Sequence, residues 1–254
     1  MVPAEVELTR FQTEIELAQR VQANLLSLPA PVIAGLDVAA LLRPGFHIGG
    51  DFYDFLLDRD QLFTFIISDI CGKGLSAALM VNMTRMALRI GANPQSALTP
   101  EEIFIQSNTI LYDDFSRAAT FASVFIGCYY LSTRTLVYAN AGHSPVIFVP
   151  AGGKAQLLIA DGAPIGVLPV SASKNHQQQF RTGDLLVVGT DGLAEAYSSG
   201  NDLWTGYRRL LKKTEKLADQ PAQAIAEALF NPLWVNDQPA AQTDDQTLVV
   251  IKCA

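Results

Sequence analysis

The chain has 254 residues, of which 49% are hydrophobic and 17% charged, and this composition predicts a packed globular protein rather than a disordered one. Its formal net charge of −7 argues against a nucleic-acid-binding surface, and it contains no apolar run of the roughly 18 residues that a membrane-spanning helix needs. The amino terminus lacks the basic start and apolar stretch of a secretory signal, so a cytoplasmic location is expected.

Histidine and cysteine are too few and too scattered for a zinc site. The chain has three of each, and neither set shows the short spacing that zinc ligands require. An odd number of distant cysteines also argues against a disulfide framework. Metal chemistry in this chain would therefore rest on oxygen ligands. The residues are Cys71, Cys128, Cys253, His47, His143 and His176.

The first predicted element is a helix over residues 5–26. Its apolar residues repeat at the alternating three- and four-residue spacing of a heptad seam, with Gln22 as a polar interruption. Two interpretations remain open: a surface helix that packs one face on the core, or a coiled-coil-like helix that mediates dimerisation or signalling. Pro29 and Pro31 end the helix. The seam consists of Leu8, Phe11, Ile15, Ala18 and Leu25.

Beyond this helix, short apolar or alternating runs bounded by Gly, Pro, Asp or Asn predict β-strands. Helices are expected among them over residues 75–90, after residue 99 and over residues 221–230. Met83 and Met86 in the first of these are interpreted as core filler. Paired strands and grouped helices predict an α+β layer arrangement. The expected strands cover residues 38–42, 52–57, 62–68, 121–131, 136–140, 146–149, 185–188 and 247–252.

Four short segments place an aspartate beside glycine or at a strand end, and two of these aspartates are expected to meet. Asp51 and Asp69 lie almost symmetrically about the polar turn at residues 58–61, so pairing the flanking strands as a hairpin brings the carboxylates together. Two anions this close repel each other unless a cation lies between them. Oxygen-only sites of this kind suit Mg²⁺ or Mn²⁺.

Asp191 and Asp244 form the second expected pair. Asp191 follows the apolar strand at residues 185–188 and precedes an expected helix, whereas Asp244 stands just before the last strand. If these two strands are antiparallel, both carboxylates lie at one edge of the sheet. Each aspartate alone could equally be an ordinary turn residue or helix cap. Four of them, two joined by hairpin symmetry, favour a metal site.

These motifs, in this order, resemble the metal-dependent protein phosphatases of type 2C (the PPM family), in the bacterial branch typified by RsbU and SpoIIE. Residues 49–54, Gly-Gly-Asp-Phe-Tyr-Asp, resemble the branch's GGD-[FY]-[FY]-D motif, and residues 69–74, Asp-Ile-Cys-Gly-Lys-Gly, resemble its D-V-S-G-[HK]-G motif. The similarity extends over roughly residues 15 to 252. Further segments that match in order are residues 75–79, 120–123, 140–145, 162–166, 183–196 and 244–247.

The resemblance implies an αββα sandwich of two antiparallel sheets flanked by helices, with a binuclear metal centre at one end. It implies two divalent cations, Mn²⁺ or Mg²⁺. Asp51 would bridge both of them, and Asp69 with the backbone carbonyl of Ile70 would bind one. Asp191 and Asp244 would bind the other. Residues 1–30 would form a linker or switch helix, and residues 31–254 the phosphatase domain.

The implied activity is hydrolysis of phosphoserine or phosphothreonine on a protein by a metal-bridged water, without a phospho-enzyme. The branch typically acts on small anti-sigma-factor antagonists or similar signalling proteins. Expected partners are thus a phosphorylated protein and, through the amino-terminal helix, a second copy of the chain; no nucleic acid or membrane partner is expected. Two alternatives stay open: a partner-binding regulatory module with little turnover, and a hydrolase of small phosphate esters.

Three residues near the motifs have less certain roles. Cys71, which replaces the branch's usual serine, is interpreted as a small buried residue rather than an oxidation-sensitive thiol. His143 is left out of the catalytic set because a loop histidine can instead fix a turn by hydrogen bonding. Glu195 is interpreted as a helix cap rather than a ligand of a third, weaker cation.

Overall fold

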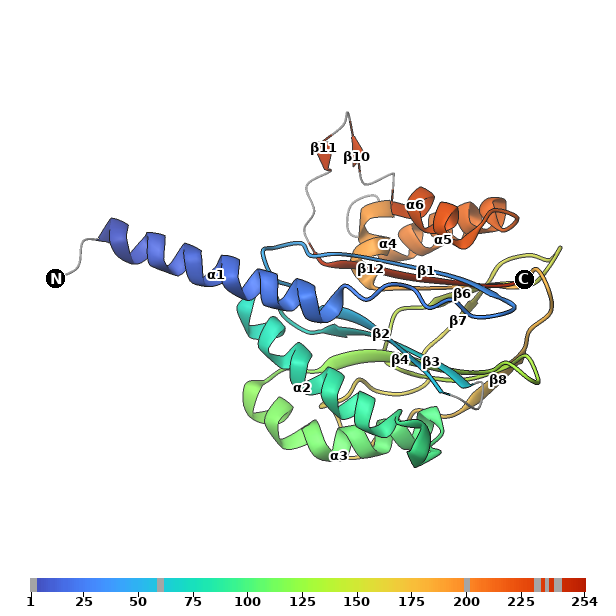
Figure 1. Cartoon of the computed structure of the whole chain (residues 1–254), viewed down its shortest axis with the longest axis horizontal. Helices are drawn as coiled ribbons and strands as arrows, with labels where there is room; N and C mark the ends of the chain where they lie inside the picture. Colours follow the sequence, from blue (N-terminus) through green and yellow to red (C-terminus); the bar gives the residue numbers. More distant parts are fainter. Residues whose placement is uncertain (1–3, 59–61, 199–201, 231–233, 236–237, 240–243) are drawn as a thin grey trace.

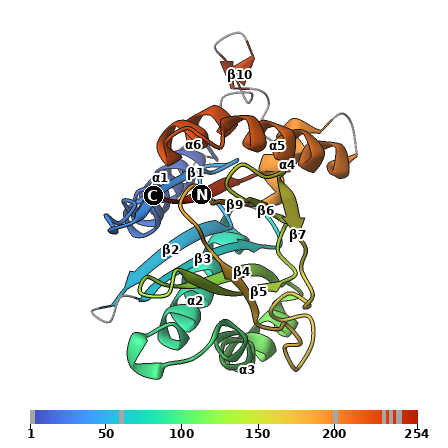
Figure 2. The ribbon, with the colours of Figure 1, turned by 90° about the vertical axis from the view of Figure 1, so that its right-hand side faces the viewer.

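Two five-stranded antiparallel sheets lie face to face, and helices cover the outer surface of each (Figures 1 and 2). The computed structural model describes residues 4–58, 62–198, 202–230, 234–235, 238–239 and 244–254. One sheet has the strand order β2-β3-β4-β5-β8 and the other the order β1-β12-β9-β6-β7. This arrangement confirms the predicted sandwich of two antiparallel sheets flanked by helices.

The eight predicted strands and five predicted helices, including the one expected after Asp191, all recur, and the predicted bounds shift by at most a few residues. The helices are α1 (Ala4–Leu26), α2 (Leu75–Gly91), the short 3₁₀ helix η1 (Pro94–Ser96), α3 (Pro100–Ala118), α4 (Asp191–Tyr197), α5 (Leu203–Leu217) and α6 (Ala222–Phe230). The strands are β1 (Leu36–Arg43), β2 (Asp51–Leu57), β3 (Leu62–Ile70), β4 (Ala122–Tyr130), β5 (Thr135–Ala141), β6 (Val146–Val149), β7 (Gln156–Leu158), β8 (His176–Gln179), β9 (Leu185–Gly189), β10 (Trp234–Val235), β11 (Gln238–Pro239) and β12 (Gln246–Cys253). Among the described residues, no helix combines the length and the apolar character that crossing a lipid bilayer requires.

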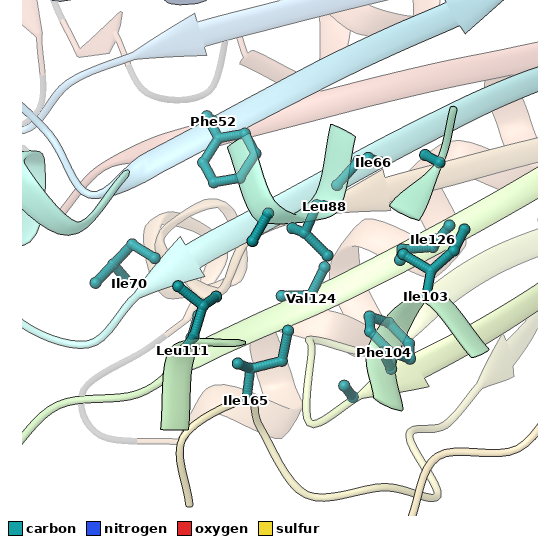
Figure 3. Close-up of a cluster of buried hydrophobic side chains, with 14 of the residues drawn as sticks. Phe52, Ile66, Ile70, Leu88, Ile103, Phe104, Leu111, Val124, Ile126 and Ile165 are labelled. Atoms are coloured by element: carbon teal, nitrogen blue, oxygen red, sulfur yellow. The ribbon is translucent and has the colours of Figure 1, made fainter. Parts of the chain in front are cut away.

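Three layers of buried apolar side chains hold the sandwich together. Between the sheets, the rings of Phe63, Phe65 and Phe125 form part of an aromatic row with neighbouring centroids 5.6 and 5.9 Å apart. Outside one sheet, Phe104 of α3 and Ile66 of β3 belong to the layer beneath α2 and α3 (Figure 3). Helices α4, α5 and α6 cover the other sheet. Because both faces of each sheet are covered, the central strands read as nearly continuous apolar runs.

Helix α2 faces the sheet mostly with small residues, together with the buried Leu88, and turns most of its large apolar residues outward. Its buried face includes Ala77, Val81 and Gly91. Met83 and Met86 are 40% and 57% exposed, so the prediction that they fill the core is wrong. Small side chains let α2 approach its neighbours closely: a Cβ added at position 91 would lie 3.0 Å from atoms of α3.

A buried ion cluster ties α2 to β2. Asp54, the last aspartate of the GGDFYD motif, is fully buried within β2. Arg89 donates hydrogen bonds of 2.6 and 2.7 Å to its two carboxylate oxygens, and Nε of Arg85 lies 2.9 Å from Oδ2. A buried carboxylate is tolerated when it is paired and hydrogen-bonded in this way. Asp54 therefore has a structural role, and it fixes the strand that begins with Asp51.

Helix α1 is anchored to the sandwich at its carboxyl end and extends away from it at the other (Figure 1). Leu26 is buried, and the Gln22 side chain makes two hydrogen bonds to the backbone of Gly49: Nε2 donates to the carbonyl at 2.8 Å, and Oε1 accepts from the amide at 3.0 Å. Leu8 and Phe11 are 59% and 58% exposed. The polar interruption of the heptad seam is thus the residue that attaches α1 to the loop before Asp51.

Candidate metal centre

The β2–β3 hairpin places Asp51 and Asp69 side by side. The two residues are direct partners in the antiparallel register, as the symmetry of the sequence predicts. Residues 59–61 of the predicted turn lie outside the described residues. Ile70 is the last residue of β3, and a Cβ added at Gly50 would lie 2.9 Å from its carbonyl oxygen. The hairpin thus brings two carboxylates and this carbonyl to one end of the sheet.

The second sheet supplies Asp191, just after the end of β9, and Asp244, just before the start of β12. Strands β9 and β12 are antiparallel, with Gly189 opposite Leu248, so the predicted placement of both aspartates at one sheet edge is confirmed. Asp191 is the first residue of α4 and Asp244 directly precedes β12. A Cβ at position 192 would lie 2.1 Å from the carbonyl oxygen of Asp245, so only glycine lets the two segments meet this closely.

Two threonines and a further aspartate join the sheets at the site. The hydroxyls of Thr190 and Thr247 both donate to Oδ2 of Asp51 at 2.8 Å, so the second sheet orients a carboxylate of the first. Asp245 accepts hydrogen bonds from the backbone amides of Gly45 at 2.7 Å and Gly50 at 2.5 Å. Sequence reasoning did not assign Thr190, Thr247 or Asp245; the doubled acid at positions 244–245 was the available signal.

The electrostatics of the buried carboxylates indicate a site built for positive charge. Burial raises the pKa of Asp51 well above its usual value, and the charges of Asp69 and Asp245 raise it further. Burial, followed by the charges of Asp191 and Asp244, raises the pKa of Asp69 to about 7. Burial and then Asp244 raise the pKa of Asp191 as well. Carboxylates that are buried and repel one another are stabilised by bound cations.

One protein cation already lies among these acids. Nζ of Lys73 is 2.8 Å from Oδ2 of Asp244, and this hydrogen bond is the largest cause of the raised pKa of Lys73. Among the described residues, no three His, Cys, Asp or Glu side chains converge tightly enough to hold a metal ion as they stand. The donor set, oxygen atoms of carboxylates and one carbonyl, nevertheless fits Mg²⁺ or Mn²⁺.

His143 fixes the loop behind the site, as expected. Its Nδ1 lies 2.8 Å from the hydroxyl of Ser123, which is the register partner of Asp69 on β4. Its backbone amide donates to Oδ1 of Asn140 at 2.7 Å. Burial lowers the pKa of His143 to about 3, so the ring is neutral at physiological pH.

Cys71 and Glu195 differ from their predicted roles. Cys71 is exposed, so its interpretation as a small buried residue is wrong; its backbone, held by Phe121 and Thr120, determines its position instead. Glu195 lies within α4, whose N-cap is Thr190, and not at a cap. Burial and the charges of Asp191 and Asp244 raise the pKa of Glu195, which makes it part of the acidic cluster.

The comparison with known families decides the relationship. The sequence profile described as stage II sporulation protein E (SpoIIE) matches residues 59–254, well over half of the chain. The chain belongs to the SpoIIE family. Phosphoserine phosphatase RsbU of Bacillus subtilis (strain 168) is 27% identical over 243 residues, which cover 95% of this chain and 70% of RsbU. The chain covers smaller shares, 57% and 24%, of two other curated members of this group.

Solved structures establish that this SpoIIE-family chain has the type 2C phosphatase fold. The SiaA-PP2C domain of Pseudomonas aeruginosa superimposes with a TM-score of 0.83 at 22% identity, covering 99% of both chains. RsbX, solved in complex with magnesium, has a TM-score of 0.68 at 16% identity and covers 88% of this chain and 98% of its own. The chain is therefore a member of the PP2C-type serine phosphatase group to which RsbU belongs.

Proposed function

We propose that this protein is a metal-dependent serine/threonine protein phosphatase. The observation that carries the proposal is the gathering of four aspartates at the ends of both sheets, where burial and neighbouring carboxylates raise the pKa of Asp51, Asp69 and Asp191. A cluster of this kind is costly to fold without a compensating positive charge, and such clusters are typical of functional sites. RsbU, which is similar to this chain over 95% of the chain's length, is named a phosphoserine phosphatase, and this supports the same activity for the present protein.

The family resemblance implies that Asp51 would lie between the two cations; in its place we propose Asp69 for that position. The charges of Asp191, Asp244, Asp245 and Glu195 all act on Asp69, whereas Asp51 is affected by Asp69 and Asp245. One oxygen of Asp51 also already accepts two threonine hydroxyls. We therefore place Asp51 and the carbonyl of Ile70 at one cation, and Asp191 and Asp244 at the other.

Two Mn²⁺ or Mg²⁺ ions at this site would supply an acidified water and positive charge opposite the phosphoryl oxygens. The magnesium found with RsbX supports this choice of cation. The chain's own residues hold the ligands in place: Thr190 and Thr247 orient Asp51, and Asp245 holds the glycine loop that precedes it. His143 is neutral and tied to Ser123, so it is not assigned a proton-transfer role.

The decisive experiment measures Mn²⁺-dependent phosphate release from a phosphoserine protein, such as a phosphorylated anti-sigma-factor antagonist, and from p-nitrophenyl phosphate. Asp191→Asn keeps the side-chain size but removes a charge that faces a cation, so turnover should fall by at least ~100-fold. The matched control is Asp219→Asn, which makes the same change at an exposed turn after α5. The neighbouring Gln220 carbonyl accepts a hydrogen bond from Lys252, near the end of β12 opposite to Asp244, so this turn lies away from the acidic cluster. Near-normal turnover by Asp191→Asn contradicts the assignment.

The same experiment separates the alternatives. Turnover of p-nitrophenyl phosphate without turnover of any phosphoprotein would favour a hydrolase of small esters. Metal binding without turnover of either substrate would favour a regulatory module. The presence of all four predicted carboxylates in one cluster favours an enzyme over that module.

We also propose that residues 1–30 are a linker or switch helix preceding a phosphatase domain at residues 31–254, and that α1 mediates a homodimer. The exposed seam residues Leu8 and Phe11 support pairing with another helix. The bonds between Gln22 and Gly49 give α1 a direct connection to the loop before Asp51. A change in the position of α1 would therefore act on the cation site through that loop.

A further inference from the structure

Helix α5 carries an exposed stripe of one aromatic and three basic residues. Trp204, Arg208, Lys212 and Lys216 recur every four residues, so each lies about one turn beyond the last on the same side of the helix. All four are exposed, and the Trp204 side chain is 54% exposed. We call these four residues the α5 stripe.

The charge of α5 is unusual for this chain. The whole protein has a formal net charge of −7, yet the 15 residues of α5 contain five basic residues and one acidic residue. Two of the basic residues bind backbone carbonyls of neighbouring segments: Arg209 donates to the Tyr197 carbonyl at 2.8 Å and Lys213 to the Ala228 carbonyl at 2.6 Å. The three basic residues of the stripe, Arg208, Lys212 and Lys216, form no ion pair with N···O within 4.0 Å to any residue that the structure describes. Hydrogen bonds from Thr205 lower the pKa of Asp202, the residue that precedes α5, and the charge of Arg208 is the last of the causes.

The stripe begins beside the acidic cluster. A Cβ at Gly206 would lie 2.0 Å from the carbonyl oxygen of Ala194, so α5 packs directly on the backbone of α4, the helix that starts at Asp191 (Figure 2). Burial raises the pKa of Tyr207 to about 12, and the charges of Asp191, Glu195 and Asp69 contribute to that rise. The Trp204 ring packs against Tyr207 with centroids 5.9 Å apart. Trp204 thus marks the end of the stripe that lies next to the site.

We propose that the α5 stripe binds an acidic segment next to the phosphorylated residue of the protein substrate. From Trp204 to Lys216 the stripe is about 18 Å long, which an extended segment of five or six residues covers. The exposed indole ring offers an apolar contact beside the phosphate site, and the three cations pair with carboxylates farther along. The proposal deepens the proposed phosphatase function and rests on it.

The test compares two phosphoserine peptides of equal length, one with five Asp or Glu residues on one side of the phosphate and one with Ser and Gly there, with p-nitrophenyl phosphate as a third substrate. Arg208→Glu with Lys212→Glu should raise KM for the acidic peptide about tenfold, because it replaces two attractions by repulsions at an exposed surface. The kcat values and the turnover of p-nitrophenyl phosphate should not change. Trp204→Ala should raise KM for both peptides.

The matched control is Lys154→Glu with Arg181→Glu, which makes the same change in net charge at two exposed positions outside α5. An equal KM rise in the control, or an unchanged KM for the acidic peptide in the stripe variant, overturns the proposal. Binding of the wild-type protein to anionic vesicles or RNA through the stripe, with no preference for the acidic peptide, also overturns it and assigns the stripe to that polyanion. If the wild-type protein hydrolyses none of the three substrates, the phosphatase function itself fails, and the stripe proposal with it.

Discussion

Replacing Asp69 by asparagine should stabilise the metal-free protein at neutral pH while abolishing its stabilisation by cations. Burial and surrounding carboxylates raise the pKa of Asp69 from 3.8 to about 7 in the folded state. Between these values the folded protein holds a proton that the unfolded chain has released, so stability falls as pH rises through this window. About 3 pH units at 1.36 kcal/mol each give a loss of up to about 4 kcal/mol above pH 7.

Urea unfolding and thermal unfolding, both in EDTA at pH 5 and pH 8, measure this effect as a free energy of unfolding and as a Tm. The wild-type protein should be less stable at pH 8 than at pH 5, and Asp69→Asn should remove much of that difference, with a Tm at pH 8 higher by roughly 10 °C for a chain of this size. Asp219→Asn, at an exposed turn, should behave like the wild type. Added Mn²⁺ should stabilise the wild type and not Asp69→Asn. If Asp69→Asn is less stable than the wild type in EDTA at pH 8, the reasoning is refuted.

Gly192→Ala should lower Mn²⁺-dependent turnover by at least ~10-fold, since its Cβ would lie 2.1 Å from a carbonyl oxygen before β12; steady-state kinetics checks this. Gln22→Leu should cost about 1–2 kcal/mol in urea unfolding and raise the Mn²⁺ concentration needed for half-maximal activity, because two hydrogen bonds are lost. Phe11→Asp with Ile15→Asp should dissociate the proposed dimer in sedimentation and change turnover at saturating Mn²⁺, with Tm within a few degrees; a monomeric wild type leaves only the surface-helix interpretation.

The sequence predicts the central strands and their aspartates well because burial on both faces leaves a clear apolar signal. Strand β9 is apolar throughout and ends two residues before Asp191. The hairpin symmetry around residues 58–61 was sufficient to pair Asp51 with Asp69. The alternation of short strands with turn residues also indicates the antiparallel order. These features depend on residues close together in the sequence, so a single sequence is enough to predict them.

Other features depend on contacts that a single sequence does not show. Strand β8 consists of polar residues and forms by pairing with the edge of β5, and β7 has three residues. Helix α2 has large apolar residues at helical spacing on its exposed side, so periodicity indicates the wrong face; apart from Leu88, mostly small residues pack against the sheet. The role of Asp245 depends on amides 200 and 195 residues away.

The attachment of α1 at Gln22 means that this helix cannot slide gradually. A shift by one residue turns the helix by about 100° and brings Val21 or Ala23 to Gly49, and neither side chain can both donate and accept a hydrogen bond. The next side-chain amide toward the amino end is Gln19, about 4.5 Å away along the axis. A signal carried by α1, as proposed above, would therefore reach the loop before Asp51 by steps from one side-chain amide to another and not by gradual sliding.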